Sequence, residues 1–434
     1  MREDRALPGT GKSLLLFSAC YYIKYILRKI EKRLADDWMP VQTLTNKYRI
    51  YPDRKTETKL AEALESCRWL YNRLLGEMAK AKDARKSLSM YDCHNMIPAL
   101  KKEYPMLNDV YSKVLQMVSQ ILWANIRGLA ELRKRGNKTG HIRYKGKGWY
   151  KTLNYNQSGF RIEGNTLSLS KIGKVRMKMH RPVEGKVKGI IIKYSDGKWY
   201  AIVQADYPSQ PLPDNDAVAG IDVGLLNFVV DSDGNSFENP RCLGRSLEKI
   251  KIVQRALSRK QNGSCNREKA RKRLSKLHEK VNNQRSDFLH KLSRYYVNNY
   301  GTICVENLDV KSLKEKGHSN GLHRSIHDAS WSRFLVMIGY KAESAGRNVI
   351  KVDARGTTQR CSRCGNITLK TLKDRVHDCP VCGLVVDRDY NAARNILIAG
   401  VGPAVELAEP KPLLRITVEQ ALTMRQEAPS FRAG

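Results

Sequence analysis

The chain has 434 residues, 41% of them hydrophobic, which suits a folded protein with one large core or two to three smaller ones. Lys and Arg number 78 against 43 Asp and Glu, a formal net charge of +35. The surplus is spread along the chain, which excludes a basic tail on an otherwise neutral domain. It indicates a polyanionic partner, and a protein that binds nucleic acid only nonspecifically fits the composition equally well.

Ten cysteines are present, and four of them form two CxxC pairs. The others, such as Cys20, Cys67, Cys93 and Cys304, show no regular spacing. This pattern favours metal binding in a reducing compartment over a disulfide framework. We therefore expect a protein of the prokaryotic cytosol, associated with the nucleoid through its polyanionic partner.

Residues 1–44 differ from the rest of the chain and are expected to be an accessory extension. The apolar run Ser13–Leu27 is interrupted by Lys24 and lacks a cleavage site behind it, so it predicts neither a signal peptide nor a membrane span. The segment Ala6–Ser13 approaches a phosphate-binding loop. Ala6 replaces the first glycine and no strand can precede it, so no nucleotide site is expected there.

Residues 45–207 are expected to form an α+β nucleic-acid recognition half. A short strand at 48–52 leads into a helix over 56–80, and a second helical region covers 91–133. Residues 153–207 alternate in the manner of strands and predict a small β-barrel or sheet. The Pro-rich residues 208–216 are expected to be a linker.

Between the helices and the strands lies a basic, glycine-rich stretch, Lys134–Lys151, that also contains aromatic residues. Lys and Arg side chains can meet phosphates while Tyr and Trp rings stack on bases. The stretch therefore predicts a loop that contacts nucleic acid, and the alternative is a solvated basic turn.

Two apolar strands each carry a carboxylate. The strand near Ala217 presents Asp222, after which Gly224 lets the backbone turn, and the strand that follows Gly301 ends on Glu306. A bare charge on a buried strand is costly unless it is paired or holds a metal ion. The order of these strands predicts the start of an RNase H-like sheet, with both acids in one site.

A third acid, Asp389, lies where an Ala-rich helix begins, and Asn391 and Asn395 share one face of that helix. Any one of these acids alone would be read as a cap or turn residue. Together, Asp222, Glu306 and Asp389 predict a catalytic cluster that holds Mg²⁺ or Mn²⁺ for phosphodiester cleavage, since hard oxygen ligands favour these ions.

The two CxxC pairs predict a structural zinc ribbon. Cys361 and Cys364 are followed by Cys379 and Cys382, and a glycine comes directly after each pair. Four thiolates complete a tetrahedron around one Zn²⁺ and leave no position open for catalysis. His377 is not needed as a ligand, and we expect it on the surface.

Residues 243–300 are expected to be a basic helical hairpin inserted between the first two acids. Ten cations crowd its first part: Lys249, Lys251, Arg255, Arg259, Lys260, Arg267, Lys269, Arg271, Lys272 and Arg273. The hairpin either contacts a nucleic-acid backbone or is simply solvated. Trp331 begins a further amphipathic helix and is expected in the core.

Taken in order, the segments Gly220–Gly224 and Val305–Leu308, the paired CxxC motifs and Asp387–Ile396 resemble the TnpB family of transposon-encoded, RNA-guided nucleases, which are related to compact type V CRISPR effectors. Further segments carry the same resemblance: Tyr48–Pro52, Cys67–Asn72 and Tyr155–Phe160. It covers about residues 46–400.

The resemblance implies an endonuclease that pairs a guide RNA with target DNA and cuts the DNA at a RuvC-type, Mg²⁺-dependent site made of Asp222, Glu306 and Asp389. It implies an α/β nuclease core over 217–358 and 385–400 and a zinc ribbon over 359–384. The Pro-containing residues 401–434 lie beyond the resemblance and are expected to be a disordered tail. Asp387 is the poorer catalytic candidate. The alternative function is a DNA-binding regulator that does not cleave, and a strand-joining transposase is disfavoured because no HxH-plus-tyrosine constellation is present.

Overall fold

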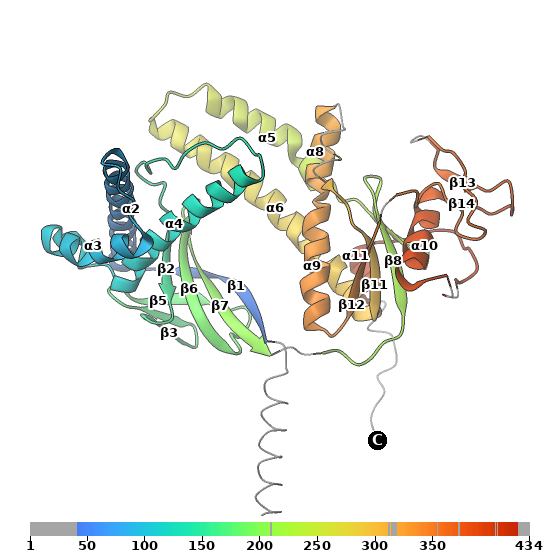
Figure 1. The fold of residues 1–434 in the computed structure, drawn as a ribbon, viewed down its shortest axis with the longest axis horizontal. Helices are drawn as coiled ribbons and strands as arrows, with labels where there is room; N and C mark the ends of the chain where they lie inside the picture. Colours follow the sequence, from blue (N-terminus) through green and yellow to red (C-terminus); the bar gives the residue numbers. More distant parts are fainter. Residues whose placement is uncertain are drawn as a thin grey trace, which may run out of the picture. The chain divides into compact units, whose positions relative to one another are not determined.

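A computed structural model describes residues 41–208, 211–310, 313, 319–353, 355–371, 374–403, 405 and 407–423. The chain divides into two compact units between Ser209 and Gln210, and Figure 1 draws both. The apolar run Ser13–Leu27 and the segment Ala6–Ser13 lie outside the described residues. None of the described helices combines the length and the apolar character that crossing a membrane requires.

The described part of the N-terminal unit contains four helical segments: α2 (Arg54–Asp83), α3 (Met90–Glu103), the short 3-10 helix η1 (Pro105–Leu107) and α4 (Ser112–Lys134). Asp53 caps α2, because its carboxylate accepts a hydrogen bond from the Thr56 amide at 2.8 Å. The helical region predicted over 91–133 is present as α3, η1 and α4. Pro105 lacks an amide hydrogen and starts η1, so the chain bends between α3 and α4.

Seven antiparallel strands form the sheet of this unit, in the order β2-β6-β7-β1-β5-β4-β3. They are β1 (Val41–Tyr51), β2 (Thr152–Asn156), β3 (Phe160–Glu163), β4 (Thr166–Leu169), β5 (Gly173–Lys178), β6 (Lys186–Ser195) and β7 (Lys198–Pro208). The β1–β7 ladder runs from the pair Val41 and Pro208 to the pair Ile50 and Trp199. Residues 41–44 therefore belong to the sheet and not to an extension, and Pro208 ends a strand instead of starting a linker.

The C-terminal unit is built on a six-stranded mixed sheet in the order β12-β11-β8-β9-β10-β15. Its strands are β8 (Val218–Val223), β9 (Asn227–Asp231), β10 (Asn235–Glu238), β11 (Thr302–Glu306), β12 (Asn348–Val352) and β15 (Leu414–Ile416). Strands β8, β9 and β10 form an antiparallel meander, whereas β11 pairs parallel with β8 and with β12. The unit is therefore α/β, as the sequence predicted.

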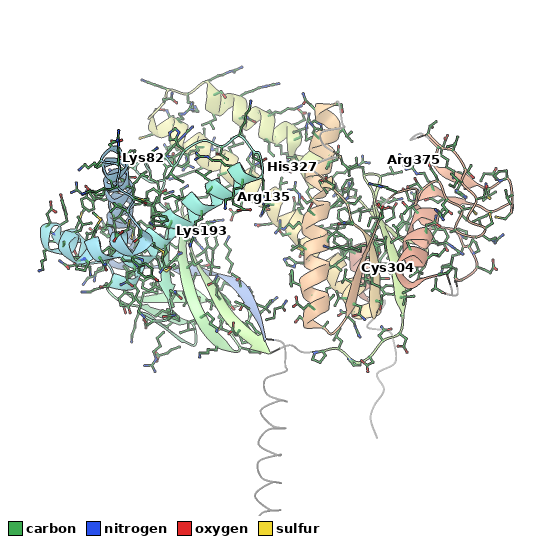
Figure 2. The ribbon with its side chains drawn as sticks, in the orientation of Figure 1. Lys82, Arg135, Lys193, Cys304, His327 and Arg375 are labelled. Carbon is green, nitrogen blue, oxygen red and sulfur yellow. The ribbon has the colours of Figure 1, made fainter. Side chains whose placement is uncertain are left out.

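Helices cover both faces of this sheet. Ile303 and Val305 of β11 pack with α6 (Cys265–Asn299) and α9 (Trp331–Ser344), and Trp331 is buried there as expected. Cys304, labelled in Figure 2, points to the other face, where it packs with α10 (Arg388–Val401). Alternate residues of a strand point to opposite faces, so one strand serves both cores. Figure 1 shows α9 and α10 on opposite sides of β11 and β8.

The end of the chain contradicts the predicted tail. β15 pairs in parallel with β10, and α11 (Val418–Thr423) follows it. Ile416 and Val418 are buried in the same core as α6 and α9. Burial of these two side chains fixes a segment that is too short for a periodic pattern to be visible in its sequence.

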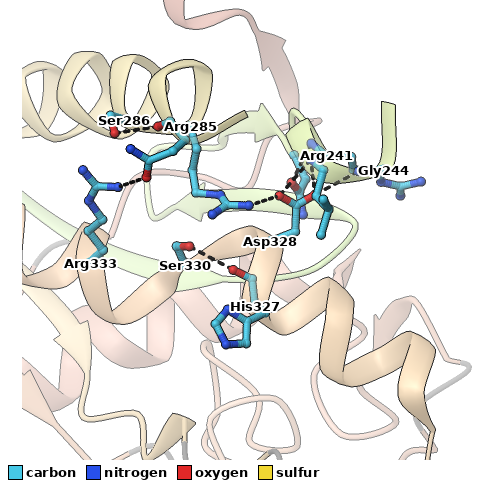
Figure 3. A network of polar contacts seen from close by, with 11 residues as sticks. Arg241, Gly244, Arg285, Ser286, His327, Asp328, Ser330 and Arg333 are labelled. Carbon is cyan, nitrogen blue, oxygen red and sulfur yellow. Dashed lines mark hydrogen bonds and ion pairs between the residues drawn. The ribbon is translucent and has the colours of Figure 1, made fainter. Parts of the chain in front are cut away.

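The predicted basic hairpin is present as α5 (Cys242–Ser258) and α6. Asp328, near the end of α8 (Asn320–Ala329), joins the two helices. Its carboxylate accepts hydrogen bonds from the Leu243 and Gly244 amides at the start of α5 and from the Arg285 guanidinium of α6 at 2.6 Å. Figure 3 shows Arg285 pointing to Asp328 from α6. Nearby, Arg333 donates to the side chain of Asn282.

We expect Asp328→Ala to destabilise the chain by about 3 kcal/mol, because it leaves the Arg285 guanidinium partly buried without its partner and uncaps α5. Thermal unfolding measures the loss. The double variant Asp328→Ala/Arg285→Met should recover part of it, since no unpaired charge then remains. An unchanged melting temperature in the single variant would mean that the ion pair contributes nothing to stability.

Candidate active site and zinc ribbon

The three predicted acids converge at one edge of the mixed sheet. Asp222 is the fifth residue of β8, Glu306 ends the neighbouring parallel strand β11, and Asp389 lies in the first turn of α10. The register pairs Val305 with Ile221, so the next residues along both strands, Glu306 and Asp222, lie side by side. All three acidic residues are only 8 to 9% exposed.

Burial and like charge act together on these groups. Burial raises the pKa of Asp222 well above its ordinary value, and the neighbouring carboxylates of Glu306 and Asp389 raise it further. Burial also raises the pKa of Glu306, although the Thr357 hydroxyl donates a hydrogen bond to it at 2.8 Å. Buried carboxylates that lie close together are unfavourable in their ionised form, and a bound cation removes this unfavourable energy.

Asp389 reaches the sheet because Gly220 lets α10 approach β8 closely. A Cβ atom on Gly220 would lie 2.1 Å from the carbonyl oxygen of Ala393 and 2.6 Å from the amide nitrogen of Leu397, both in the backbone of α10. No side chain fits at this distance, so the helix would have to move. The glycine at the start of the motif therefore positions the third acid.

Gly220→Ala is expected to destabilise the C-terminal unit by roughly 1–3 kcal/mol, because the added methyl group forces α10 away from β8. The measurement is thermal unfolding. Gly339→Ala is the matched control, since Gly339 lies within α9 and an added Cβ there meets nothing within 4 Å. That control should be neutral or stabilising by up to about 1 kcal/mol. Equal melting temperatures for both variants would contradict the close approach.

The sequence placed Asn391 and Asn395 on one face of α10 but assigned them no role, and the structure shows that they hold this helix in place. Asn391 accepts a hydrogen bond from the Ser362 amide at 2.9 Å and donates to the Arg360 carbonyl at 2.7 Å. Asn395 donates to the carbonyls of Thr357 and Arg360. The four-residue spacing of the two asparagines was the signal available in the sequence, because it puts both side chains on one face of α10. Through these bonds that face of the helix holds residues 357–362, which lead into the first CxxC pair.

The two aspartates that flank Arg388 have different environments. Asp387 caps α10, because its carboxylate accepts hydrogen bonds from the amides of Asp389 and Tyr390. Asp389 faces the other acids and forms an ion pair with Arg388 at 3.1 Å. Arg388 also donates to the carbonyl of Asp374 and thereby connects this acid to the segment between the CxxC pairs.

The acid cluster suits a hard divalent cation. It offers three carboxylates from three elements, and Mg²⁺ prefers oxygen ligands of this kind. Among the described residues, the one group of three or more His, Cys, Asp or Glu side chains whose ligand atoms all lie within 4.8 Å of one another is formed by the cysteines, so the carboxylates of the three acids are farther apart than that.

The four cysteines Cys361, Cys364, Cys379 and Cys382 meet as the sequence predicted. Two of the sulfur–sulfur distances are 3.5 and 3.6 Å, close to the roughly 3.8 Å that a tetrahedral zinc site with Zn–S bonds of about 2.3 Å requires. A hydrogen bond from the Cys382 amide helps to lower the pKa of Cys379 to about 6, which favours the thiolate. The cluster can therefore hold a structural metal ion.

The glycines after the two pairs have a conformational role. Gly365 and Gly383 both have positive φ, and each donates its amide hydrogen to the carbonyl of the first cysteine of its pair. These turns fold each CxxC segment around the metal position. Strands β13 (Val376–Asp378) and β14 (Val385–Asp387) close the ribbon and lead directly into α10.

The expectation for His377 was wrong. Its side chain is fully buried on β13, and neither ring nitrogen has a hydrogen-bond partner among the residues that the structure describes. Burial lowers the pKa of this histidine and favours its neutral form. The reason is the ribbon's size: so small a β-hairpin has few side chains to cover its interior, and an imidazole two residues before Cys379 serves as one of them.

Comparison with known families places the chain. Residues 198–317 match the OrfB_IS605 family, described as "Probable transposase". Residues 331–396 match the family described as "Cas12f1-like, TNB domain", which spans the cysteine cluster and most of α10. Residues 39–87 match a family described as "Helix-turn-helix domain"; in the structure this range contains β1 and α2.

Curated relatives point the same way. A "Putative RNA-guided DNA endonuclease" of Streptomyces pristinaespiralis is 31% identical over 82% of this chain and 89% of its own length. InsQ of Escherichia coli K12, with the same description, is 28% identical over 82% of this chain and 91% of its own. The Cas12f1 endodeoxyribonuclease of Sulfoacidibacillus thermotolerans is 31% identical over 47% of this chain and 51% of its own length.

Among solved structures, a cryo-EM structure of a Cas12f1–sgRNA–target DNA complex is similar in fold, with a TM-score of 0.50 and 14% identity. The match covers 82% of this chain and 98% of the other. The acid-bearing strands, the paired CxxC motifs and the matches along most of the chain agree with one another. The chain belongs to the TnpB family, the OrfB group associated with IS605-type elements.

Proposed function

We propose that this chain is an RNA-guided, Mg²⁺-dependent DNA endonuclease encoded by a mobile element and acting on DNA in the cytosol. The observation that carries the proposal is the convergence of Asp222, Glu306 and Asp389, all buried, from two strands and a helix. The printed names of the two long relatives support guidance by RNA and cleavage of DNA.

The proposed division of labour follows the two units. Residues 217–358 and 385–400 supply an RNase H-like (RuvC-type) nuclease core, and β15 and α11 complete it. Residues 359–384 form the zinc ribbon, and the described residues 41–208 form the recognition half. The similar Cas12f1 complex contains a guide RNA and target DNA, which supports both as partners of this chain.

In the proposed mechanism, Asp222, Glu306 and Asp389 would hold the catalytic Mg²⁺. When bound, the metal supplies a more acidic water and stabilises charge on the leaving oxygen of the phosphodiester. The chain's own residues fix the geometry: Thr357 orients Glu306 by its hydrogen bond, and Asp387 sets the start of α10 and thus the place of Asp389. Arg388 balances part of the negative charge of Asp389 through their ion pair.

The proposed zinc ion is structural. Cys361, Cys364, Cys379 and Cys382 would hold it and leave no open position for substrate. Because β14 runs directly into α10, the folded ribbon fixes the approach of the chain to the third acid.

The direct test is purification of the full chain from cells that express its native locus, followed by sequencing of the co-purifying RNA. The complex is then incubated with Mg²⁺ and plasmids that carry the matching target. A discrete RNA together with guided cuts is the expected result. A discrete RNA with binding but no cutting would favour the non-cleaving regulator, and absence of any RNA would contradict both functions.

A further inference from the structure

The basic, aromatic stretch after α4 builds a pocket within the N-terminal unit. Its volume is about 590 Å³, and α2, α4 and the segment 141–149 line it. Two large aromatic side chains stand open to solvent at this segment: Trp149 is 75% exposed and Tyr144 is 61% exposed. A single exposed ring, such as Tyr91, is ordinary on a protein surface, but two on one segment beside one pocket indicate a binding surface.

The loop is held in place by α2 and is not a loose solvated turn. The Asn72 side chain accepts a hydrogen bond from the Lys145 amide at 2.8 Å and donates one to the Lys145 carbonyl at 3.0 Å. Arg68 donates a third bond to the same carbonyl at 2.9 Å. The backbone amide and carbonyl of Lys145 are therefore both held by hydrogen bonds. A loop that is already ordered loses less conformational entropy when it binds a ligand.

Cations and rings alternate around the pocket. The Lys145 ammonium lies 4.8 Å from the ring centre of the buried Tyr71, while His141 and Arg143 lie on the rim. Among the residues that line the pocket, all within the described part of the chain, none is acidic. These features favour an anionic ligand that also presents a flat apolar face to Trp149 and Tyr144.

We propose that this pocket binds an unpaired nucleotide of the guide RNA, whose base stacks on Trp149 while Arg143 and Lys145 contact the adjoining phosphates. The proposal rests on the proposed function for the presence of a guide. Single-stranded RNA fits both requirements, since an unpaired base offers its face to aromatic side chains and its backbone is anionic. A base-paired duplex would offer phosphates but no free base face.

The test uses the purified full chain and a short single-stranded RNA that carries one fluorescent adenine analogue. Stacking on a ring quenches the analogue, and titration gives the dissociation constant. We expect Trp149→Ala to weaken binding about 5- to 150-fold and to remove the quenching, which is the range for loss of one base–aromatic stack. Trp149→Phe should retain most of both. Tyr91→Ala is the matched control, because Tyr91 is a similarly exposed aromatic residue on α3.

Single-stranded DNA of the same sequence forms the second arm. If Trp149→Ala weakens binding of DNA but leaves RNA unaffected, the pocket serves a DNA strand and the proposal falls. It also falls if Trp149→Ala binds RNA as tightly as the unaltered chain. Neither readout needs cleavage, and both should be the same in an Asp222→Ala background, so failure of this inference is distinguishable from failure of the nuclease function.

Discussion

We expect Asp222→Ala to abolish guided DNA cleavage and to leave the binding of RNA and target DNA intact, which is the largest effect that the structure predicts. Asp222 lies beside Glu306 and near Asp389, so its loss removes the carboxylate that faces both others. Metal stabilisation of the transition state amounts to several kcal/mol, so cleavage should fall by about 10³-fold or more. Plasmid cleavage and a filter-binding assay measure the two properties separately.

Asp353→Ala is the matched control. Asp353 directly follows β12, as Glu306 ends β11, but its side chain is 73% exposed and takes no part in the acid cluster. It should cleave normally. A second readout does not depend on activity: Mg²⁺ should raise the melting temperature of the unaltered chain and of Asp353→Ala, but not that of Asp222→Ala. Cleavage by Asp222→Ala at the normal rate would remove this residue from the site.

The strand-borne acids were predictable because their local pattern conflicts with burial. Asp222 and Glu306 interrupt apolar strands, and a carboxylate at such a position demands a partner. The positions of these two strands as neighbours, with Val305 opposite Ile221, could not be read from the sequence, since the meander and the long helical hairpin separate them along the chain. The structure brings the acids together, whereas their catalytic roles stay a prediction.

What the sequence hid were features that depend on tertiary contacts. β15 is a short strand, and its place beside β10 is fixed by burial of Ile416 and not by any repeat. His377 looks like a surface residue by type but fills the interior of the ribbon. Similarly, the start of β1 at Val41 depends on its pairing with Pro208, far along the chain. A one-dimensional pattern carries no information about such partners.

The hydrogen bonds of α10 connect the ribbon to the acid cluster, and this connection gives the second large effect. Cys379→Ser removes one of the four thiolate ligands of the tetrahedral site. Loss of a residue that only hydrogen-bonds to a ligand lowers metal affinity by about 10- to 100-fold, so loss of the ligand itself should lower zinc affinity by at least about 100-fold. Zinc binding is coupled to folding. The ribbon should therefore lose its structure, and Arg360 and Ser362 should no longer hold Asn391 at the start of α10.

The measurements are zinc content by elemental analysis, thermal unfolding and guided cleavage. In Cys379→Ser we expect zinc to fall from one ion per chain toward none, the melting temperature to drop, and cleavage to be lost although Asp222, Glu306 and Asp389 are all present. Cys265→Ser is the control, because Cys265 is an exposed cysteine at the start of α6 and should change none of the three. Full zinc content in Cys379→Ser would contradict the ribbon. Full cleavage with zinc lost would instead show that α10 keeps Asp389 in place without the ribbon, through its packing on Gly220 alone.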